Sequence, residues 1–334
     1  MTPWSLSSLT YVTPLVSFSL TWIVLTVLIR TWSDRILDHP NDRSLHRRPV
    51  PRMGGIAVAT GIAASVPFVS QVEWWPLWLG ASVLVGISFL DDLIGLPIIG
   101  RLLVHFVVAG ACVMSLLLGQ LGAGWAFVAL VAIVWMTNLY NFMDGMDGLA
   151  GGMAVFGFGF LAIAAGIGGN ISFALVNASI ASAAGAFLLF NFHPARMFLG
   201  DAGSTTFGFL AAGLGLIGWR EGAWSLWFPV LIFSPFIVDA TVTLVRRAVQ
   251  GERFWQAHRT HYYQRLILSG WSHRKTALVE YGLMLFCGIC ALVFQWAPGS
   301  IRLVIVGLLA LGFMGLAQAV SRVEQRVSGK RAFD

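Results

Sequence analysis

Charged residues are scarce in this chain. Only 11% of its 334 residues are Asp, Glu, Lys or Arg, whereas 57% are hydrophobic. A soluble domain carries about 25% charged residues, which form much of the surface that faces water. So few charges cannot coat a soluble core of this size, and the composition excludes an ordinary soluble globular protein. It predicts a polytopic membrane protein.

Cysteine is also rare, with Cys112, Cys287 and Cys290 as its three positions. The last two form C-x-x-C, but inside the apolar run GLMLFCGICALVF, which is typical of packed thiols rather than of a metal or redox pair. The first ten residues contain no Lys or Arg, so no signal peptide is expected. The first apolar segment is therefore predicted to be an uncleaved span.

Eleven apolar runs are candidates to cross about 30 Å of hydrocarbon. They lie near residues 9–29, 53–70, 74–90, 98–119, 124–140, 152–168, 171–190, 203–219, 224–245, 276–296 and 300–320. Ten is the alternative count, because the stretch 152–190 can be divided differently. The chain is thus expected to be an all-α integral membrane protein, a helical bundle formed by one domain over residues 1–334.

The basic residues orient this bundle, since cytoplasmic loops carry an excess of Lys and Arg. With eleven spans, only Arg220 and Arg302 of the 21 Lys and Arg residues fall on the opposite side. The N-terminus is therefore predicted outside the cytoplasm, in the periplasm, and the C-terminus inside. Five aspartates lie at cytoplasmic span ends: Asp91, Asp92, Asp144, Asp147 and Asp201. A carboxylate in lipid costs about 3 kcal/mol or more, so such groups usually line a polar cavity.

Clustered carboxylates beside basic loops suit a divalent metal with a phosphate ligand, because Mg²⁺ takes one or two carboxylates and completes its shell with phosphate and water. Two loops supply basic groups: His46, Arg47, Arg48 and Arg52 in one, and His258, Arg259, His261 and Arg265 in the other. Each motif alone has a structural explanation. MDGMDG and GDAGS can cap helices, and basic loops can bind anionic lipid. Because these motifs are predicted to lie together on one membrane face, a site that binds a metal ion and phosphate groups is favoured.

Five motifs in order resemble the polyprenyl-phosphate N-acetylhexosamine-1-phosphate transferases, the glycosyltransferase family 4 membrane enzymes that include MraY and WecA. The motifs are RPVPRMGGI, FLDDLIG, NFMDGMDGLAGG, NFHPARMFLGDAGS and HRTHYYQRL. The resemblance implies catalytic loops near 30–52, 91–97, 141–151, 191–204 and 246–275. It further implies transfer of an amino-sugar phosphate from a UDP-N-acetylhexosamine to undecaprenyl phosphate, with release of UMP, on the cytoplasmic face of the bacterial inner membrane. Mg²⁺ is the implied cofactor, with Mn²⁺ as the alternative.

The resemblance also implies roles for individual residues. Asp201 matches the family's metal ligand, with Asp92 as a second metal candidate, and the catalytic set is Asp91, Asp92, Asp201 and His261. Asn141, Asp144 and Asp147 match the uridine and diphosphate pocket, and Phe198 matches an aromatic ring that stacks on uracil. Arg47, Arg48 and His258 complete the substrate-binding set. No nucleic-acid partner is expected, and a homodimer stays open.

The last loop departs from the best-known members, which carry three consecutive histidines or an H-x-H-H pattern, whereas this chain has HYYQR after Thr260. The motif HRTHYYQRL looks like the WbpL type, which starts O-antigen and related polysaccharides. GlcNAc and 6-deoxy amino sugars such as FucNAc or QuiNAc are the candidate sugars. The alternatives are an MraY-type enzyme of peptidoglycan synthesis, a non-catalytic scaffold, and a secondary transporter. Against a transporter, only Asp239 lies well inside a span.

Overall fold

The computed structural model describes residues 8–32, 34–40, 44–46, 48–253, 256 and 258–331. Within these ranges it is an all-α bundle, and the sheet it contains is a pair of two-residue strands, β1 (Leu37–Asp38) and β2 (Val50–Pro51). The prediction of an all-α polytopic membrane protein is confirmed. Nine helices of the described chain are long and apolar enough to cross a membrane.

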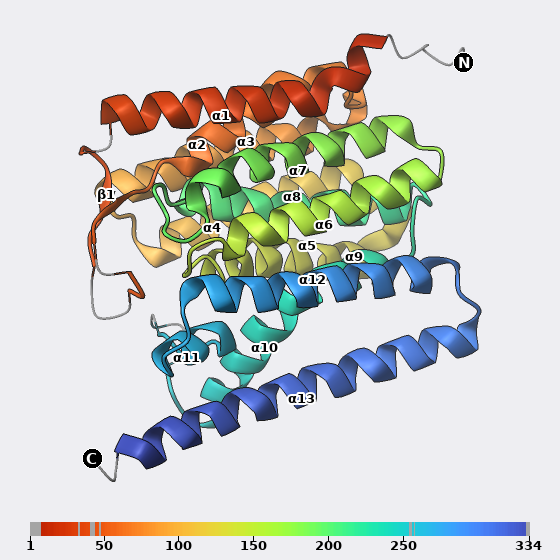
Figure 1. Ribbon diagram of the computed structural model, residues 1–334. Coiled ribbons are helices and arrows are strands. Elements are labelled where there is room, and N and C mark those ends of the chain that lie inside the picture. Colours follow the sequence, from red (N-terminus) through yellow and green to blue (C-terminus); the bar gives the residue numbers. More distant parts are fainter. Residues whose placement is uncertain are drawn as a thin grey trace.

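The nine long spans correspond to nine α-helices, and those of α1 and α3 also include residues of the 3-10 turn that precedes each helix. The helices are α1 (Thr13–Trp32), α3 (Trp75–Ile94), α4 (Ile98–Leu116), α5 (Leu118–Phe142), α6 (Leu149–Ile167), α7 (Ile171–Asn191), α8 (Asp201–Arg220), α12 (His273–Trp296) and α13 (Gly299–Arg331). They match nine of the eleven predicted spans. The N-terminal end of α1 and the C-terminal end of α13 lie at opposite ends of the bundle (Figure 1), as an odd number of crossings requires.

The other two predicted spans are shorter or broken. The span near 53–70 becomes α2 (Gly54–Ser65), followed by a 3-10 turn that contains Pro67. The span near 224–245 was expected to be continuous, but it divides into α9 (Trp227–Ile232) and α10 (Ser234–Val249). Pro235 stands in the first turn of α10, where its missing N–H is tolerated, whereas a continuous helix would need that N–H as a donor. The short helix α11 (Tyr262–Leu268) follows in the last large loop.

Helix α8 occupies the middle of the bundle and packs against α2, α3 and α5. Small residues permit this close approach: a Cβ added to Gly55 of α2 would lie 2.2 Å from the backbone nitrogen of Gly203 in α8. Any larger side chain at Gly55 would therefore push the helices apart. By contrast, most large apolar side chains of α13 are exposed, which is typical of a helix that faces lipid.

The loops that contain the predicted site gather at one end of the bundle, where β1, α11 and the C-terminus lie (Figure 1). Backbone hydrogen bonds lock two of these loops together. The amide of Phe198 donates to the carbonyl oxygen of Pro51 at 2.7 Å, and the amide of Gly54 donates to the carbonyl oxygen of Phe198 at 2.9 Å. The P-x-x-G-G turn and the segment before α8 are thereby fixed against each other. Which membrane face this end occupies stays a prediction.

Candidate active site

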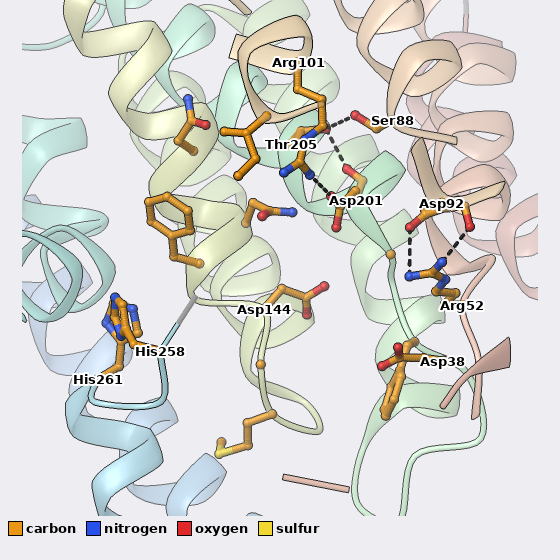
Figure 2. A pocket seen from close by; sticks show the side chains of 18 of the residues that line it. Asp38, Arg52, Ser88, Asp92, Arg101, Asp144, Asp201, Thr205, His258 and His261 are labelled. Carbon is orange, nitrogen blue, oxygen red and sulfur yellow. Dashed lines mark hydrogen bonds and ion pairs between the residues drawn. The ribbon is translucent and has the colours of Figure 1, made fainter. Parts of the chain in front are cut away.

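Asp201 begins helix α8, directly after Gly200, whose φ of +73° is a conformation that favours glycine. A carboxylate in the first turn of a helix is stabilised by the helix dipole. The Nη1 atom of Arg101, at the start of α4, lies 3.0 Å from Asp201 Oδ2 and 2.7 Å from Asp91 Oδ2 of α3. One guanidinium thus joins two carboxylates from different helices. Figure 2 shows its contact with Asp201.

Asp92, the next residue of α3, points to the other side of this junction. Its side chain is buried, and Arg52 of the P-x-x-G-G turn lies beside it. Arg52 Nη1 is 3.6 Å from Asp92 Oδ1, and Arg52 Nη2 donates a hydrogen bond to the backbone carbonyl oxygen of Asp92 at 2.6 Å. Within the described chain, the buried Asp92 Oδ2 has no hydrogen-bond partner. A Cβ added to Gly200 would come within 2.8 Å of that oxygen. The backbone thus leaves room beside an unsatisfied carboxylate oxygen.

Asn141 and Asp144 come from the end of α5 and the loop behind it. Asn141 Nδ2 donates to Ser204 Oγ of α8 at 3.0 Å, which ties this loop to the helix that Asp201 begins. Burial raises the pKa of Asp144 well above its usual range, and the nearby charges of Asp201, Asp92 and Asp38 raise it further. A cation placed among these carboxylates would relieve their mutual repulsion.

Asp147 has different neighbours, although it stands only three residues after Asp144. His193 Nδ1 lies 2.6 Å from its Oδ2, and His273 Nδ1 lies 3.4 Å from its Oδ1. Burial by itself would raise the pKa of Asp147, but hydrogen bonds from His273 and His193 outweigh it and lower the pKa. The two aspartates of MDGMDG therefore differ: Asp144 belongs to a carboxylate cluster, and Asp147 is held between two imidazoles.

The last large loop reaches the site through His258 and His261, whose ring centroids are 4.8 Å apart. His261 is buried, and its Nδ1 lies 3.2 Å from Asp239 Oδ1 of α10. The same carboxylate accepts the backbone amides of Tyr262 and Tyr263 at 3.0 and 3.3 Å, so it caps α11. Asp239 is therefore a local anchor for this loop rather than an isolated charge inside a span.

His258 provides a pH test of this loop. Burial lowers its pKa from 6.5 to about 4, and the charges of His261 and Arg247 act in the same direction. Since the unfolded chain then binds more protons than the folded chain between these values, stability is lost as the pH falls from about 6.5 to about 4. We expect His258→Gln to lose less thermal stability than the wild type between pH 7.5 and pH 5, as measured by melting temperature in detergent. Equal losses would show that this histidine is not buried as described.

Phe198 and the basic loop complete the arrangement. The Phe198 ring is half-buried and packs edge-on against His46, with 4.9 Å between the ring centroids. Arg48 is exposed and is not among the residues that line the cavity, and Arg47 lies outside the described residues. Arg52 and His46 of this loop both line the cavity. Arg265 of the other basic loop instead pairs with Glu324 of α13.

A cavity of about 760 Å³ unites these groups. Eight of the predicted residues line it: Asp92, Asn141, Asp144, Asp147, Phe198, Asp201, His258 and His261. Asp91 does not line it, but it pairs with Arg101, which does. Figure 2 shows Asp92 with Arg52 on one side and the two histidines on the other, with Asp144 between them. Sequence reasoning missed Arg101, His193, His273 and the anchoring role of Asp239, because their partners lie far away along the chain.

Another wall of the cavity comes from α4 and α5 and is mainly apolar, with His105 and Asn138 as polar members. Its apolar residues are Ile98, Leu102, Phe106, Val131, Val134 and Trp135. Leu102, Phe106 and Val131 are 39%, 42% and 46% exposed, so this wall continues into the outer apolar surface of the bundle. One cavity thus combines a charged end with an apolar side that faces lipid. It suits a ligand with an anionic head and a hydrocarbon chain.

The carboxylate set fits a Mg²⁺ ion. Asp92 and Asp201 both line the cavity, their oxygens are the hard ligands that Mg²⁺ prefers, and Asp92 Oδ2 lacks another partner among the described residues. Asp144 adds negative charge nearby. Arg52 and Arg101 remain as fixed cations for anionic substrate groups.

A multi-pass membrane bundle with clustered carboxylates and arginines at one end defines a class of membrane-embedded enzymes that act on phosphorylated substrates. Residues 74–218 match the model of glycosyl transferase family 4. A phospho-N-acetylmuramoyl-pentapeptide-transferase of Desulforamulus reducens (strain ATCC BAA-1160 / DSM 100696 / MI-1) is 31% identical over 261 residues, which cover 67% of this chain and 76% of the relative. The chain belongs to glycosyl transferase family 4.

Two further relatives match nearly the whole chain. A probable undecaprenyl-phosphate N-acetylglucosaminyl 1-phosphate transferase of Bacillus subtilis (strain 168) is 28% identical over 326 residues, which cover 92% of this chain and 91% of the relative. A decaprenyl-phosphate N-acetylglucosaminephosphotransferase of Mycobacterium leprae (strain TN) is 25% identical over 343 residues, covering 86% and 84%. The similarity therefore extends over the spans and all five loops, beyond the part that the family model matches.

Proposed function

We propose that this protein transfers an N-acetylhexosamine-1-phosphate group from a UDP-sugar to undecaprenyl phosphate and releases UMP. The observation that carries the proposal is the single cavity in which a carboxylate–arginine cluster adjoins an apolar wall from α4 and α5. A UDP-sugar is soluble, whereas a polyprenyl phosphate is held in the bilayer, so their reaction needs a site at that boundary. The names of the relatives from Bacillus subtilis and Mycobacterium leprae describe enzymes that act on such lipids.

The chemistry joins two anions. An oxygen of the lipid phosphate forms a new bond to the β-phosphorus of the UDP-sugar, and the bond from that phosphorus to the UMP oxygen breaks. The main barrier is charge repulsion, which fixed cations in a partly desolvated site reduce. Arg101 and Arg52 are positioned to bind the phosphate oxygens, each already oriented by a carboxylate. A Mg²⁺ ion held by Asp92 and Asp201 would supply further charge neutralisation when bound.

The two substrates are assigned to different parts of the cavity, according to the residues that line each part. We assign the uridine end to Phe198, Asn141, Asp144 and Asp147, and the lipid end to the wall of α4 and α5. His258 and His261 lie across the cavity from Asp92 and would contact the diphosphate or the sugar (Figure 2). The sugar in this proposal is GlcNAc or a 6-deoxy amino sugar such as FucNAc or QuiNAc, and the product starts an O-antigen or related surface polysaccharide. The motif HRTHYYQRL supports that branch.

A substrate panel tests the proposal. The purified protein in detergent, with Mg²⁺ and undecaprenyl phosphate, is supplied separately with UDP-GlcNAc, UDP-FucNAc, UDP-QuiNAc and UDP-MurNAc-pentapeptide, and the release of UMP is measured. We expect release from one of the first three. Release of UMP from the pentapeptide donor alone would assign the protein to peptidoglycan synthesis instead. If no donor gives lipid-dependent release of UMP, the transferase assignment is refuted.

Phe198 gives an independent test of the uridine end. Phe198→Ala is expected to weaken binding of UMP and of the UDP-sugar by about 1–3 kcal/mol, the range for stacking of a base on an aromatic side chain. Isothermal titration with UMP measures this without turnover. Phe192→Ala is the matched control, because Phe192 precedes the same segment but packs against Tyr281, with 6.3 Å between the ring centroids. Equal UMP affinity in Phe198→Ala and wild type would show that the Phe198 ring does not contact the uracil base.

A further inference from the structure

Three side chains from distant parts of the chain meet beside the carboxylate cluster. Asp147 lies in the loop between α5 and α6, His193 in the loop between α7 and α8, and His273 at the start of α12. One oxygen or nitrogen atom from each lies within 4.8 Å of the others. The two imidazole rings are stacked, with centroids 5.1 Å apart and 27° between their planes. This group shares no residue with Asp91, Asp92 or Asp201.

The cluster has partly shielded ligand atoms. The side chains of Asp147 and His273 are 8% and 12% exposed, whereas that of His193 is 38% exposed. The amide of Ala195 donates to Asp147 Oδ2 at 3.2 Å, which orients the carboxylate. The amide of Asp147 donates to His273 Nδ1 at 3.4 Å, so this nitrogen is unprotonated in that contact, and a metal ion would have to displace the amide to reach its lone pair. A metal ion requires such a lone pair.

We propose that Asp147, His193 and His273 form a second cation site, one that takes a transition metal such as Zn²⁺. Two imidazole nitrogens and one carboxylate are typical ligands of Zn²⁺, whereas Mg²⁺ prefers oxygen ligands throughout. The set leaves a fourth coordination position, as in zinc sites that keep one position open. Asp147 and His273 line the large cavity, so that open position faces it.

The distances permit this with a small adjustment. Ligands at about 2.0–2.2 Å in a tetrahedral zinc site are separated from one another by roughly 3.3–3.5 Å. Asp147 Oδ1 and His273 Nδ1 are already 3.4 Å apart, but His193 Nδ1 contacts the other carboxylate oxygen, Oδ2, so the carboxylate would have to turn to present one oxygen to both imidazoles. The 2.6 Å between Asp147 Oδ2 and His193 Nδ1 is that of a hydrogen bond, so the ion has to replace the shared proton and these atoms must separate by less than about 1 Å. His193 then carries its ring proton on Nε2.

Zinc at this site would affect binding of the nucleotide donor, an expectation that rests on the proposed function. Asp147 belongs to the end of the cavity that we assign to the nucleotide, so a zinc ion on its carboxylate would obstruct the UDP-sugar. Zinc would therefore raise the KM for the donor at constant Mg²⁺. Zinc binding itself does not depend on this assignment.

Metal binding is measured directly on the full-length protein in detergent. The protein is equilibrated with ZnCl₂ in excess MgCl₂, which occupies oxygen-ligand sites, then desalted and analysed for zinc by mass spectrometry. Competition with a chromophoric chelator gives the affinity. We expect about one Zn²⁺ per wild-type chain, bound at least about 10-fold more weakly in His193→Gln and in His273→Gln. Co²⁺ in place of Zn²⁺ should give the visible absorption of a four-coordinate site in the wild type but not in His193→Gln or His273→Gln.

His258→Gln is the matched control, because His258 and His261 form the other histidine pair at the cavity. It should retain the zinc. Loss of zinc in His258→Gln but not in His193→Gln would overturn the proposal, as would a wild-type chain that binds no zinc in excess Mg²⁺. Circular dichroism and size-exclusion elution establish that each variant is folded. If the protein binds zinc as described but zinc leaves the KM for the donor unchanged, the site stands and the nucleotide assignment of Asp147 fails.

Discussion

Asp201→Asn is expected to abolish turnover and Mg²⁺ dependence together. Asn is nearly the same size and is also favoured at helix N-termini, so α8 should begin normally. What is lost is one negative charge at the point where α3, α4 and α8 meet and where Arg101 is bound. Removing one preorganised hydrogen-bond donor from an active site typically costs about 10²–10³-fold in kcat. We expect a loss of at least that size, measured as UMP release across a Mg²⁺ titration.

Two further measurements separate metal binding from folding. Mn²⁺ binding, followed by electron paramagnetic resonance, should weaken in Asp201→Asn in proportion to its loss of Mg²⁺ dependence. Glu73→Gln is the matched control, since Glu73 is an exposed carboxylate in the turn before α3, at the other end of that helix. The control should keep wild-type activity. An Asp201→Asn protein with wild-type Mg²⁺ dependence would show that this carboxylate does not hold the metal.

Asp91 is expected to act through Arg101 rather than as a base. Its Oδ1 accepts the amide of Leu96 at 2.6 Å and its Oδ2 accepts Arg101 at 2.7 Å, so both oxygens are engaged. A base is scarcely needed, because the second pKa of a phosphate monoester is about 6 and the lipid phosphate is mostly a dianion near pH 7. Asn keeps one acceptor oxygen and Ala keeps none. We expect Asp91→Asn to lose roughly 10-fold in kcat and Asp91→Ala about 10²–10³-fold.

The pH profile and a mutant cycle decide between the two roles. If Asp91 positions Arg101, both Asp91 variants keep the wild-type pH profile of kcat. The double variant that combines Asp91→Ala with Arg101→Ala then has the same kcat as Arg101→Ala alone. If Asp91 removes a proton from the lipid phosphate, the Asn and Ala variants are equally impaired and recover as the pH rises above 8. Equal loss in Asn and Ala together with an altered profile would therefore refute the positioning role.

The spans were predictable because hydropathy is a local property of the chain. Nine of the eleven predicted runs appear as long helices, including α8, whose first residue is the predicted metal ligand. The break at Phe233 was missed, although Pro229 and Pro235 on either side were a usable signal. Helix ends shifted by a few residues, and α13 continues to Arg331, because polar residues can extend a helix beyond the hydrocarbon.

The site was predictable in its residues but not in its connections. Alternation of the spans places the five predicted loops at one end of the bundle, and eight candidates accordingly line one cavity. Asp144 and Asp147 could not be told apart by their shared MDGMDG motif. The structure separates them, because a loop turn directs one toward Asp201 and the other toward His193 and His273.

The sequence by itself thus determined a membrane bundle and the set of ionisable groups at one end of it, since both depend on the order of apolar and charged residues. Only the tertiary structure decided that Arg52 rather than Arg48 reaches the site, that Arg101 joins Asp91 to Asp201, and that Asp239 anchors His261. These contacts join residues from 10 to 100 positions apart. Their partners are set by how α3, α4, α8 and α10 pack, and packing depends on side-chain shape across helices, which no local pattern encodes.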